Sequence, residues 1–492
     1  MARRIGRRTS LSGAVAVAVV AATLVGCAPE SARWNPGQSA RPTSEAAPGH
    51  STPVKDPLYP DYGNPKIDVL RYDLKLSWSP RERELAGEAT IRLRAVERID
   101  EVALDFSDAL TVSETTVDGQ AANPEQEGRD LVTPLAEPVE ADTELTLVVT
   151  YAGTPEPVPM PSNRGDFSEG IGLRVESDGA IWTMQEPYGA FTWYPVNDHP
   201  SDEALYDFAV TVPKGWSAAA SGELVGERRD GDHTVFTWRA AEPVGSYVTT
   251  LAVARFAKHT DEVDGIPLTY WVPDEYDGYQ LAAMRRSPEI LRWLSERFGD
   301  YPFSSAGAVA VDSASAMETQ GMITMGGRIA QNLPSDEAQQ IFTEVLVHEY
   351  AHQWFGDAVS PKDWRGVWLN EGFATYVTGL WLMDKGLVDE TDYVRALRDR
   401  DKQSRAEAGP PGDYNRRMFA ASNVYVGPAL MLHEIREEVG DKAFFAMARD
   451  WVQDNLHTHQ DRESFTTFVN RHTGRDLTPI VNKWLDSKTT PR

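Results

Sequence analysis

The sequence predicts a multidomain chain: an N-terminal antiparallel β domain, sandwich-like, followed by a mainly helical α+β domain. Its 492 residues exceed the size of one ordinary domain. Between residues 57 and 255, apolar and polar residues alternate in many short stretches, which is typical of strands that bury one face. From residue 256 to residue 492, apolar residues recur at three- and four-residue spacing, which indicates helices.

The first 26 residues have the features of a secretory signal peptide. Four arginines lie within the first eight residues, and an apolar run from residue 11 to residue 25 follows them. The run ends in Leu-Val-Gly-Cys27, which resembles the lipobox of bacterial lipoproteins. That resemblance implies a lipidated Cys27 and an extracytoplasmic protein anchored to the bacterial cell membrane. A plain signal peptide and a twin-arginine signal remain alternatives.

Residues 27–56 are rich in Pro, Ser, Ala and Gly and predict a flexible tether behind the anchor. The β domain then begins at residue 57. Turn signals such as Asp-Gly separate its strands, as expected for an antiparallel sandwich or curved sheet. The clearest predicted strands are Ile67–Trp78, Glu88–Val96, Glu144–Tyr151 and Tyr206–Val212. The β region ends near Phe256, after the stretch Ser246–Arg255.

The second half shows a helical pattern that starts after residue 256. A Pro/Gly-rich loop at residues 409–412 separates the third predicted helix from the fourth. The predicted helices are Ala282–Phe298, Glu337–Trp354, Glu371–Met383 and Val424–Val439, followed by helical residues 442–484.

Charge and cysteine content exclude several classes of protein. The 48 Lys and Arg residues against 74 Asp and Glu residues leave a net charge of −26, which argues against a nucleic-acid binder. Cys27 is the only cysteine, so the chain forms no internal disulfide and no Cys-rich metal site.

Residues 348–352 carry the pattern His-Glu-x-x-His inside a predicted helix. Residues four apart lie on one face of a helix, so His348 and His352 can bind one cation together. Glu349 lies beside that face and can take a proton from metal-bound water. Glu371 follows His352 after eighteen residues on the next predicted helix and can supply the third ligand that catalytic zinc sites commonly use.

The spacing HExxH-x18-E, within VHEYAHQWFGD and WLNEGFATY, resembles the gluzincin aminopeptidases of the M1 family. The resemblance implies a thermolysin-like catalytic domain that binds one Zn²⁺ per chain through His348, His352 and Glu371. It also implies hydrolysis of the N-terminal bond of peptides that carry a free N-terminus, with Glu349 activating the zinc-bound water. Longer members have a helical C-terminal domain, and the length of this chain predicts a short form without it.

Two further motifs of that family concern the amino group of the substrate. Residues 315–319, Ser-Ala-Met-Glu-Thr, resemble its Gly-Ala-Met-Glu-Asn motif, with Ser and Thr as departures. The match implies that Glu318 binds the α-amino group and that Ala316 and Met317 contact the substrate. Residues 183–187, Thr-Met-Gln-Glu-Pro, resemble the β-domain segment that carries a second amine-binding acid, here Glu186. Met184 stands where the family has Gln.

Tyr425 lies 54 residues after Glu371, where the family has its catalytic tyrosine. A phenol hydroxyl there can donate to the oxygen that becomes negative during hydrolysis. Gly427 and Pro428 replace the Lys and Gly of the family pattern, and Tyr414 is a second candidate.

Two other functions fit the same residues. A zinc endopeptidase is favoured by the short C-terminus and the altered amine-binding motif. A non-catalytic surface lipoprotein that binds peptides would keep a degenerate zinc site. Of the other histidines, His433 is expected to be packed, while His457 and His459 are expected at an exposed helix end or in an adventitious metal pair.

Overall fold

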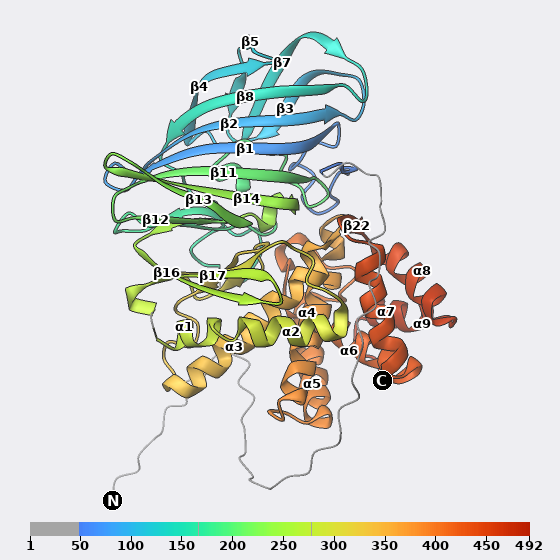
Figure 1. Ribbon diagram of the computed structural model, residues 1–492. Coiled ribbons are helices and arrows are strands. Elements are labelled where there is room, and N and C mark those ends of the chain that lie inside the picture. Colours follow the sequence, from blue (N-terminus) through green and yellow to red (C-terminus); the bar gives the residue numbers. More distant parts are fainter. Residues whose placement is uncertain (1–48, 166, 277) are drawn as a thin grey trace, which may run out of the picture.

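The computed structural model describes residues 49–165, 167–276 and 278–492 (Figure 1). The predicted signal peptide, Cys27 and most of the predicted tether therefore lie outside the described residues. The packed chain starts close to residue 51, slightly before the predicted start of the β domain, because the Ser51 amide donates to Asp68 over 2.9 Å. Within the described ranges, no helix has both the length and the apolarity needed to cross a membrane.

An eight-stranded sheet forms the body of the β domain, with the strand order β13-β14-β11-β1-β2-β8-β4-β5. Its pairs are antiparallel except for β1 and β11, which run parallel. In β8, every second residue from Leu145 to Tyr151 is buried, as the alternation predicts. The strands are β1 Ile67–Ser79, β2 Glu84–Ala95, β4 Leu110–Val117, β5 Gln120–Ala121, β8 Glu144–Gly153, β11 Glu203–Pro213, β13 Glu223–Asp230 and β14 His233–Gly245.

Two smaller sheets complete the β domain. The first has the order β3-β7-β6 and contains β3 Ile99–Asp105, β6 Glu125–Glu127 and β7 Asp130–Val139. The second has the order β12-β15-β10-β9 and contains β9 Gly172–Val175, β10 Ile181–Met184, β12 Ser217–Ala220 and β15 Leu251–Ala254. Strand β10 leads directly into the segment that carries Glu186.

The second half is a mixed domain, because a five-stranded sheet accompanies its helices. The sheet has the order β16-β17-β18-β20-β19 and contains β16 Phe256–Val263, β17 Ile266–Pro273, β18 Ala306–Val311, β19 Ala316–Met317 and β20 Ile323–Gly326. The sequence pattern predicted helices from residue 256 onward and missed these strands. Strand β18 (AGAVAV) is buried at all six positions, so it lacks the alternation that marks a strand with one exposed face.

Nine helices lie in the described part of this domain, several of them below strands β16 and β17 in Figure 1. Helix α5 lies between the third and fourth predicted helices, where no helix was predicted. Its sequence is mostly charged and has too few apolar positions to show a helical pattern. The helices are α1 Tyr279–Met284, α2 Ser287–Phe298, α3 Ser335–His352, α4 Val367–Asp384, α5 Glu390–Ala408, α6 Ser422–Val439, α7 Asp441–Asp454, α8 Arg462–Thr473 and α9 Thr478–Asp486.

Buried polar contacts join the two domains. The Glu203 carboxylate, at the start of β11, accepts a hydrogen bond from Ser360 and lies 3.6 Å from His459 Nε2. Ser360 belongs to β21 Val359–Pro361 and His459 to β22 Thr458–Gln460. The expectation of an exposed helix end at His457 and His459 is therefore wrong. Helix α7 ends at Asp454, His459 belongs to β22, which pairs with β21, and the side chains of both His459 and the preceding His457 are half-buried.

Candidate active site

Helix α3 presents two histidines on one face. His348 and His352 are one turn apart at its C-terminal end, with ring centroids 4.8 Å apart. Immediately beyond the helix, Gly356 has φ +145, a conformation that favours glycine. A Cβ atom at Gly356 would lie 3.3 Å from His352 Nδ1 and 3.2 Å from the Asn370 amide, so glycine also lets helix α4 pack close to the histidines.

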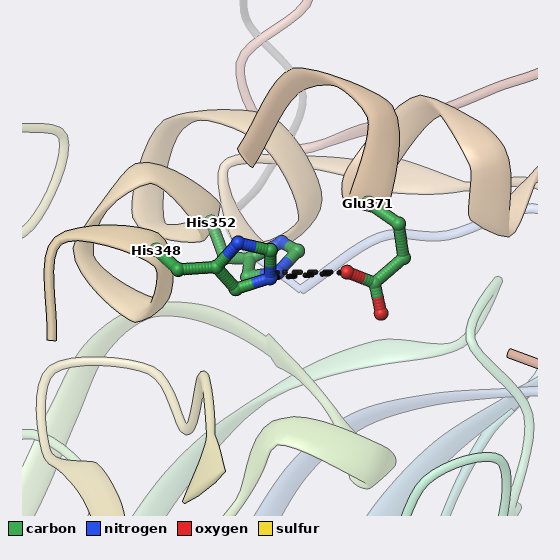
Figure 2. Close-up of side chains that lie close together, drawn as sticks. All are labelled: His348, His352 and Glu371. Carbon is green, nitrogen blue, oxygen red and sulfur yellow. Dashed lines mark hydrogen bonds and ion pairs between the residues drawn. The ribbon is translucent and has the colours of Figure 1, made fainter. Parts of the chain in front are cut away.

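Helix α4 brings Glu371 against the two histidines (Figure 2). Glu371 Oε2 lies 3.2 Å from His348 Nε2 and 3.4 Å from His352 Nε2, and the two Nε2 atoms are 3.1 Å apart. Tetrahedral zinc with ligand bonds of 2.0–2.1 Å separates its donor atoms by about 3.3–3.4 Å. The three donors therefore fit Zn²⁺ in both chemistry and spacing.

The surroundings act differently on the three donors. Burial opposes the charge of His352, but the charges of Glu318, Glu371 and Glu349 and a hydrogen bond with Glu371 raise the pKa of His352 well above its usual value. His352 Nδ1 lies 3.2 Å from the Phe355 carbonyl, a contact that leaves Nε2 for the cation. Burial lowers the pKa of His348, which favours neutral imidazole. Burial opposes the charge of Glu371, but hydrogen bonds from the two histidines outweigh it and hold the pKa of Glu371 below its usual value. Glu371 is therefore ionised, as a metal ligand must be.

Glu349 is buried beside the histidines. A carboxylate oxygen of Glu349, one of Glu318 and a ring nitrogen of His352 all lie within 4.8 Å of one another. Burial, reinforced by the charge of Glu318, raises the pKa of Glu349. The geometry thus places a carboxylate that can exchange a proton next to the predicted zinc donors.

Glu318 and Glu186 approach the same place from two different domains. Glu318 directly follows β19, which consists of Ala316 and Met317, and Glu186 lies shortly after β10 in the β domain. Each has an Oε1 atom that is buried without a hydrogen-bond partner among the described residues. Burial, together with the charges of Glu318 and Glu371, raises the pKa of Glu186. Two acids with unpaired oxygens form a site for a cationic group.

Tyr425 lies on helix α6 with its ring nearly parallel to that of His348, at a centroid distance of 6.0 Å. Burial raises the pKa of Tyr425 well above 10, so the hydroxyl remains a hydrogen-bond donor. Tyr414, the second candidate, donates its hydroxyl to the Trp364 carbonyl over 2.5 Å and serves packing instead. His433 is buried with Nδ1 3.2 Å from the Tyr376 hydroxyl, consistent with the expected packing role.

Two site residues escaped prediction from the sequence. Arg164 Nη1, in the loop between β8 and β9, lies 3.7 Å from Glu186 Oε2, and its charge partly offsets the rise in the pKa of Glu186, Glu349 and Tyr425 that burial causes. No local pattern marks Arg164. Gln353 follows His352 directly and is fully buried, and its position next to the HExxH pattern was the only available signal.

A three-donor site with a glutamate between two helical histidines defines the class of zinc metallopeptidases. Comparison with known families agrees with this class. Residues 69–248 match the "Peptidase M1 N-terminal domain" and residues 282–484 match the "Peptidase family M1 domain". The chain belongs to peptidase family M1.

The chain is also similar to individual members of the family. It is 24% identical to the "Probable M1 family aminopeptidase 2" of Encephalitozoon cuniculi over 66% of this chain and 41% of that protein. It is 26% identical to "Aminopeptidase N" of Acetobacter pasteurianus over 64% of this chain and 90% of that protein. The chain thus spans about two fifths of the length of the first relative and most of the second.

Among solved structures, the chain resembles an M1 zinc metallopeptidase from Deinococcus radiodurans, at 28% identity and a TM-score of 0.78. The match covers 89% of this chain and 98% of the other. A further structure is described as a two-domain M1 zinc metallopeptidase. The match to it covers 99% of that protein, with 28% identity and a TM-score of 0.76. The likeness therefore extends over the whole of a two-domain family member.

Proposed function

We propose that this protein is a zinc-dependent aminopeptidase that removes the N-terminal residue from peptides with a free amino terminus, an activity of the EC 3.4.11 type. One observation carries the proposal: Glu318 and Glu186 each bury an oxygen that has no hydrogen-bond partner, and both lie at the candidate zinc site. A carboxylate oxygen of Glu318 is within 4.8 Å of a His352 ring nitrogen, and the charges of Glu318 and Glu371 act on Glu186. A substrate ammonium group would neutralise these carboxylates, and the scissile bond one residue away would then lie at the metal.

In this mechanism, His348, His352 and Glu371 would hold the metal. When bound, zinc would supply a Lewis acid for the substrate carbonyl and for a water molecule. Glu349 accepts the proton of that water and returns it to the departing amine. Tyr425 donates its hydroxyl to the carbonyl oxygen as negative charge develops there.

The amine-binding residues determine where the peptide is cut. Glu318, with Glu186 in support, binds the ammonium group, and we place Ala316 and Met317 along the neighbouring substrate backbone. Arg164 beside Glu186 limits the negative charge of this part of the site. An internal peptide segment has no ammonium group to offer, so its binding would leave Oε1 of Glu318 and Oε1 of Glu186 buried without a hydrogen-bond partner.

The relatives support this assignment. The curated relatives from Encephalitozoon cuniculi and Acetobacter pasteurianus are named aminopeptidases. A Deinococcus radiodurans M1 zinc metallopeptidase, 28% identical with a TM-score of 0.77, was solved bound to a Tyr-Ser-Ala substrate. Short peptides with a free N-terminus are accordingly the substrate class that we propose here.

A matched pair of peptides tests the proposal. A peptide with a free amino terminus should be cleaved, and its N-acetylated form should be cleaved at least about 10²-fold more slowly, because a buried charge pair is lost. Glu349→Gln should abolish turnover while zinc stays bound. Equal cleavage of both peptides would indicate an endopeptidase. Full activity of Glu349→Gln would refute the mechanism, and no cleavage by the wild-type enzyme would favour a peptide-binding protein.

We further propose that the protein is exported and anchored to the bacterial cell membrane through a lipid on Cys27. The arginine-rich start, the apolar run and the Leu-Val-Gly-Cys sequence support this. Expression in a bacterium with lipoprotein processing should place the protein in the membrane fraction, and Cys27→Ala should release it. Retention of Cys27→Ala in the membrane fraction would contradict the anchor.

A further inference from the structure

Gln353 connects the metal-binding helix to the residue proposed to bind the substrate amine. It follows His352 directly, and its side chain is completely buried, with 0% exposure. Its Nε2 atom donates to the backbone carbonyl of Glu318 over 2.9 Å. One covalent step and one hydrogen bond therefore link a predicted zinc ligand to Glu318.

The amide of Gln353 uses its full hydrogen-bonding capacity. Nε2 also donates to Asp357 Oδ2 over 2.7 Å. Oε1 accepts from the Gly321 backbone amide over 2.9 Å and from the Tyr301 hydroxyl over 3.1 Å. The side chain is fully buried, and its amide donates two hydrogen bonds and accepts two. Exchanging the nitrogen and the oxygen would break all four bonds, so the amide has a single orientation and the side chain is rigidly held.

Two of these four bonds reach the segment that carries Glu318. The Glu318 carbonyl and the Gly321 amide bracket residues 318–321, so Gln353 holds both ends of that turn. The other side of the turn is attached to the β domain, where the Gln320 side chain donates to the Pro243 carbonyl over 3.0 Å. The two bonds to Gln353 attach this turn to the residue that directly follows helix α3.

We propose that Gln353 is a positioning residue that sets the distance between the zinc donors and Glu318. This distance determines which peptide bond, counted from the free amino terminus, lies at the metal. The inference rests on the proposed function, because it assumes that Glu318 binds the amine. Glutamine is suited to this position. A carboxylate there would face the Glu318 carbonyl and Asp357 with acceptors only, and asparagine is one methylene too short to reach both sides.

Binding of two small ligands tests the inference without turnover. An amino-acid hydroxamate and the matching acyl hydroxamate without the amine both chelate zinc, and only the first presents an ammonium group. Titration calorimetry on the zinc-loaded protein measures both dissociation constants. The dissociation constant of the acyl hydroxamate divided by that of the amino-acid hydroxamate gives the preference for the amine. We expect Gln353→Met to reduce this ratio about tenfold, because the bond that orients Glu318 is lost.

A matched variant controls for the substitution itself. Gln280 is also buried in the catalytic domain, and its Nε2 donates to the Gly327 carbonyl over 2.8 Å, away from Glu318. Gln280→Met should leave the ratio unchanged. If Gln353→Met does not fold, Gln353→Asn should show the reduced ratio, because it retracts the same amide.

A double-mutant cycle separates positioning from a general structural role. Glu318→Gln should remove most of the amine preference, and adding Gln353→Met to it should remove no more, because both changes act on one interaction. A wild-type ratio in Gln353→Met, or equal weakening of both ligands, would overturn the inference. A wild-type protein that binds both hydroxamates equally would instead count against the proposed function.

Discussion

The buried acid at the domain joint leads to a quantitative prediction about pH and stability. The Glu203 side chain is 1% exposed, and burial raises its pKa to about 8 even though the Ser360 hydroxyl donates to it. The neighbouring His459 offers no compensating charge, because burial lowers its pKa to about 4. Replacing Glu203 by Gln keeps the shape and an acceptor for Ser360 and removes the titration.

The sign and size of the effect follow from proton linkage. Glu203 has a folded pKa of about 8 against 4.5 for an ordinary glutamate, so the folded protein binds more protons than the unfolded chain between these values. The stability contributed by protonation is complete below pH 4.5 and is lost as the pH rises to 8. At 1.36 kcal/mol per pKa unit, the loss is on the order of 5 kcal/mol at most.

Thermal unfolding of wild type and Glu203→Gln at half-unit steps from pH 5 to pH 8 measures this effect. The melting temperature of the variant should rise relative to wild type as the pH increases, because only wild type must bury the charge. Glu144→Gln, at an exposed position on β8, is the matched control and should show no pH-dependent difference. A difference between wild type and Glu203→Gln that stays constant across this range would refute the reasoning.

Three further predictions concern the metal site. Tyr425→Phe should lower kcat by about 10²–10³ in steady-state assays with little change in KM, because a donor to the developing oxyanion is lost. Gly372→Ala should cost about 1–3 kcal/mol in urea unfolding and also lower kcat, because its Cβ would lie 2.4 Å from that of Pro428 and force helices α4 and α6 apart. Chelation of zinc should lower the melting temperature by on the order of 10 °C, because the ligand-linked stabilisation is lost.

Each of these results has a clear contrary outcome. Unchanged kcat in Tyr425→Phe would remove that hydroxyl from the mechanism. Gly386→Ala is the control for Gly372→Ala, because no atom lies within 4 Å of a Cβ at Gly386, although its φ of +68 adds local strain. Equal effects of the two glycine variants on kcat would argue against the contact with Pro428. A melting temperature that a chelator leaves unchanged would contradict a zinc site that is loaded in the folded protein.

Local periodicity accounts for the parts of the site that the sequence predicted. Helical geometry places His348 and His352 on one face whatever surrounds them, and the structure adds Glu371 within 3.4 Å of both. Alternation likewise predicted β1, β2, β8 and β11, since each buries one face. The buried strand β18 and the charged helix α5 have no such signal, and the pattern missed both.

The sequence by itself determined the chemistry of this protein: which residues can ligate zinc, which acid can move a proton, and that a β domain precedes the catalytic one. Only the tertiary structure decided how the acids that we propose to bind the amine come to lie near the candidate zinc donors. Glu186 and Arg164 come from the β domain, and Gln353 holds the turn that carries Glu318. These contacts join residues far apart in the chain, and their partners are set by packing between domains, which no local pattern of residues encodes.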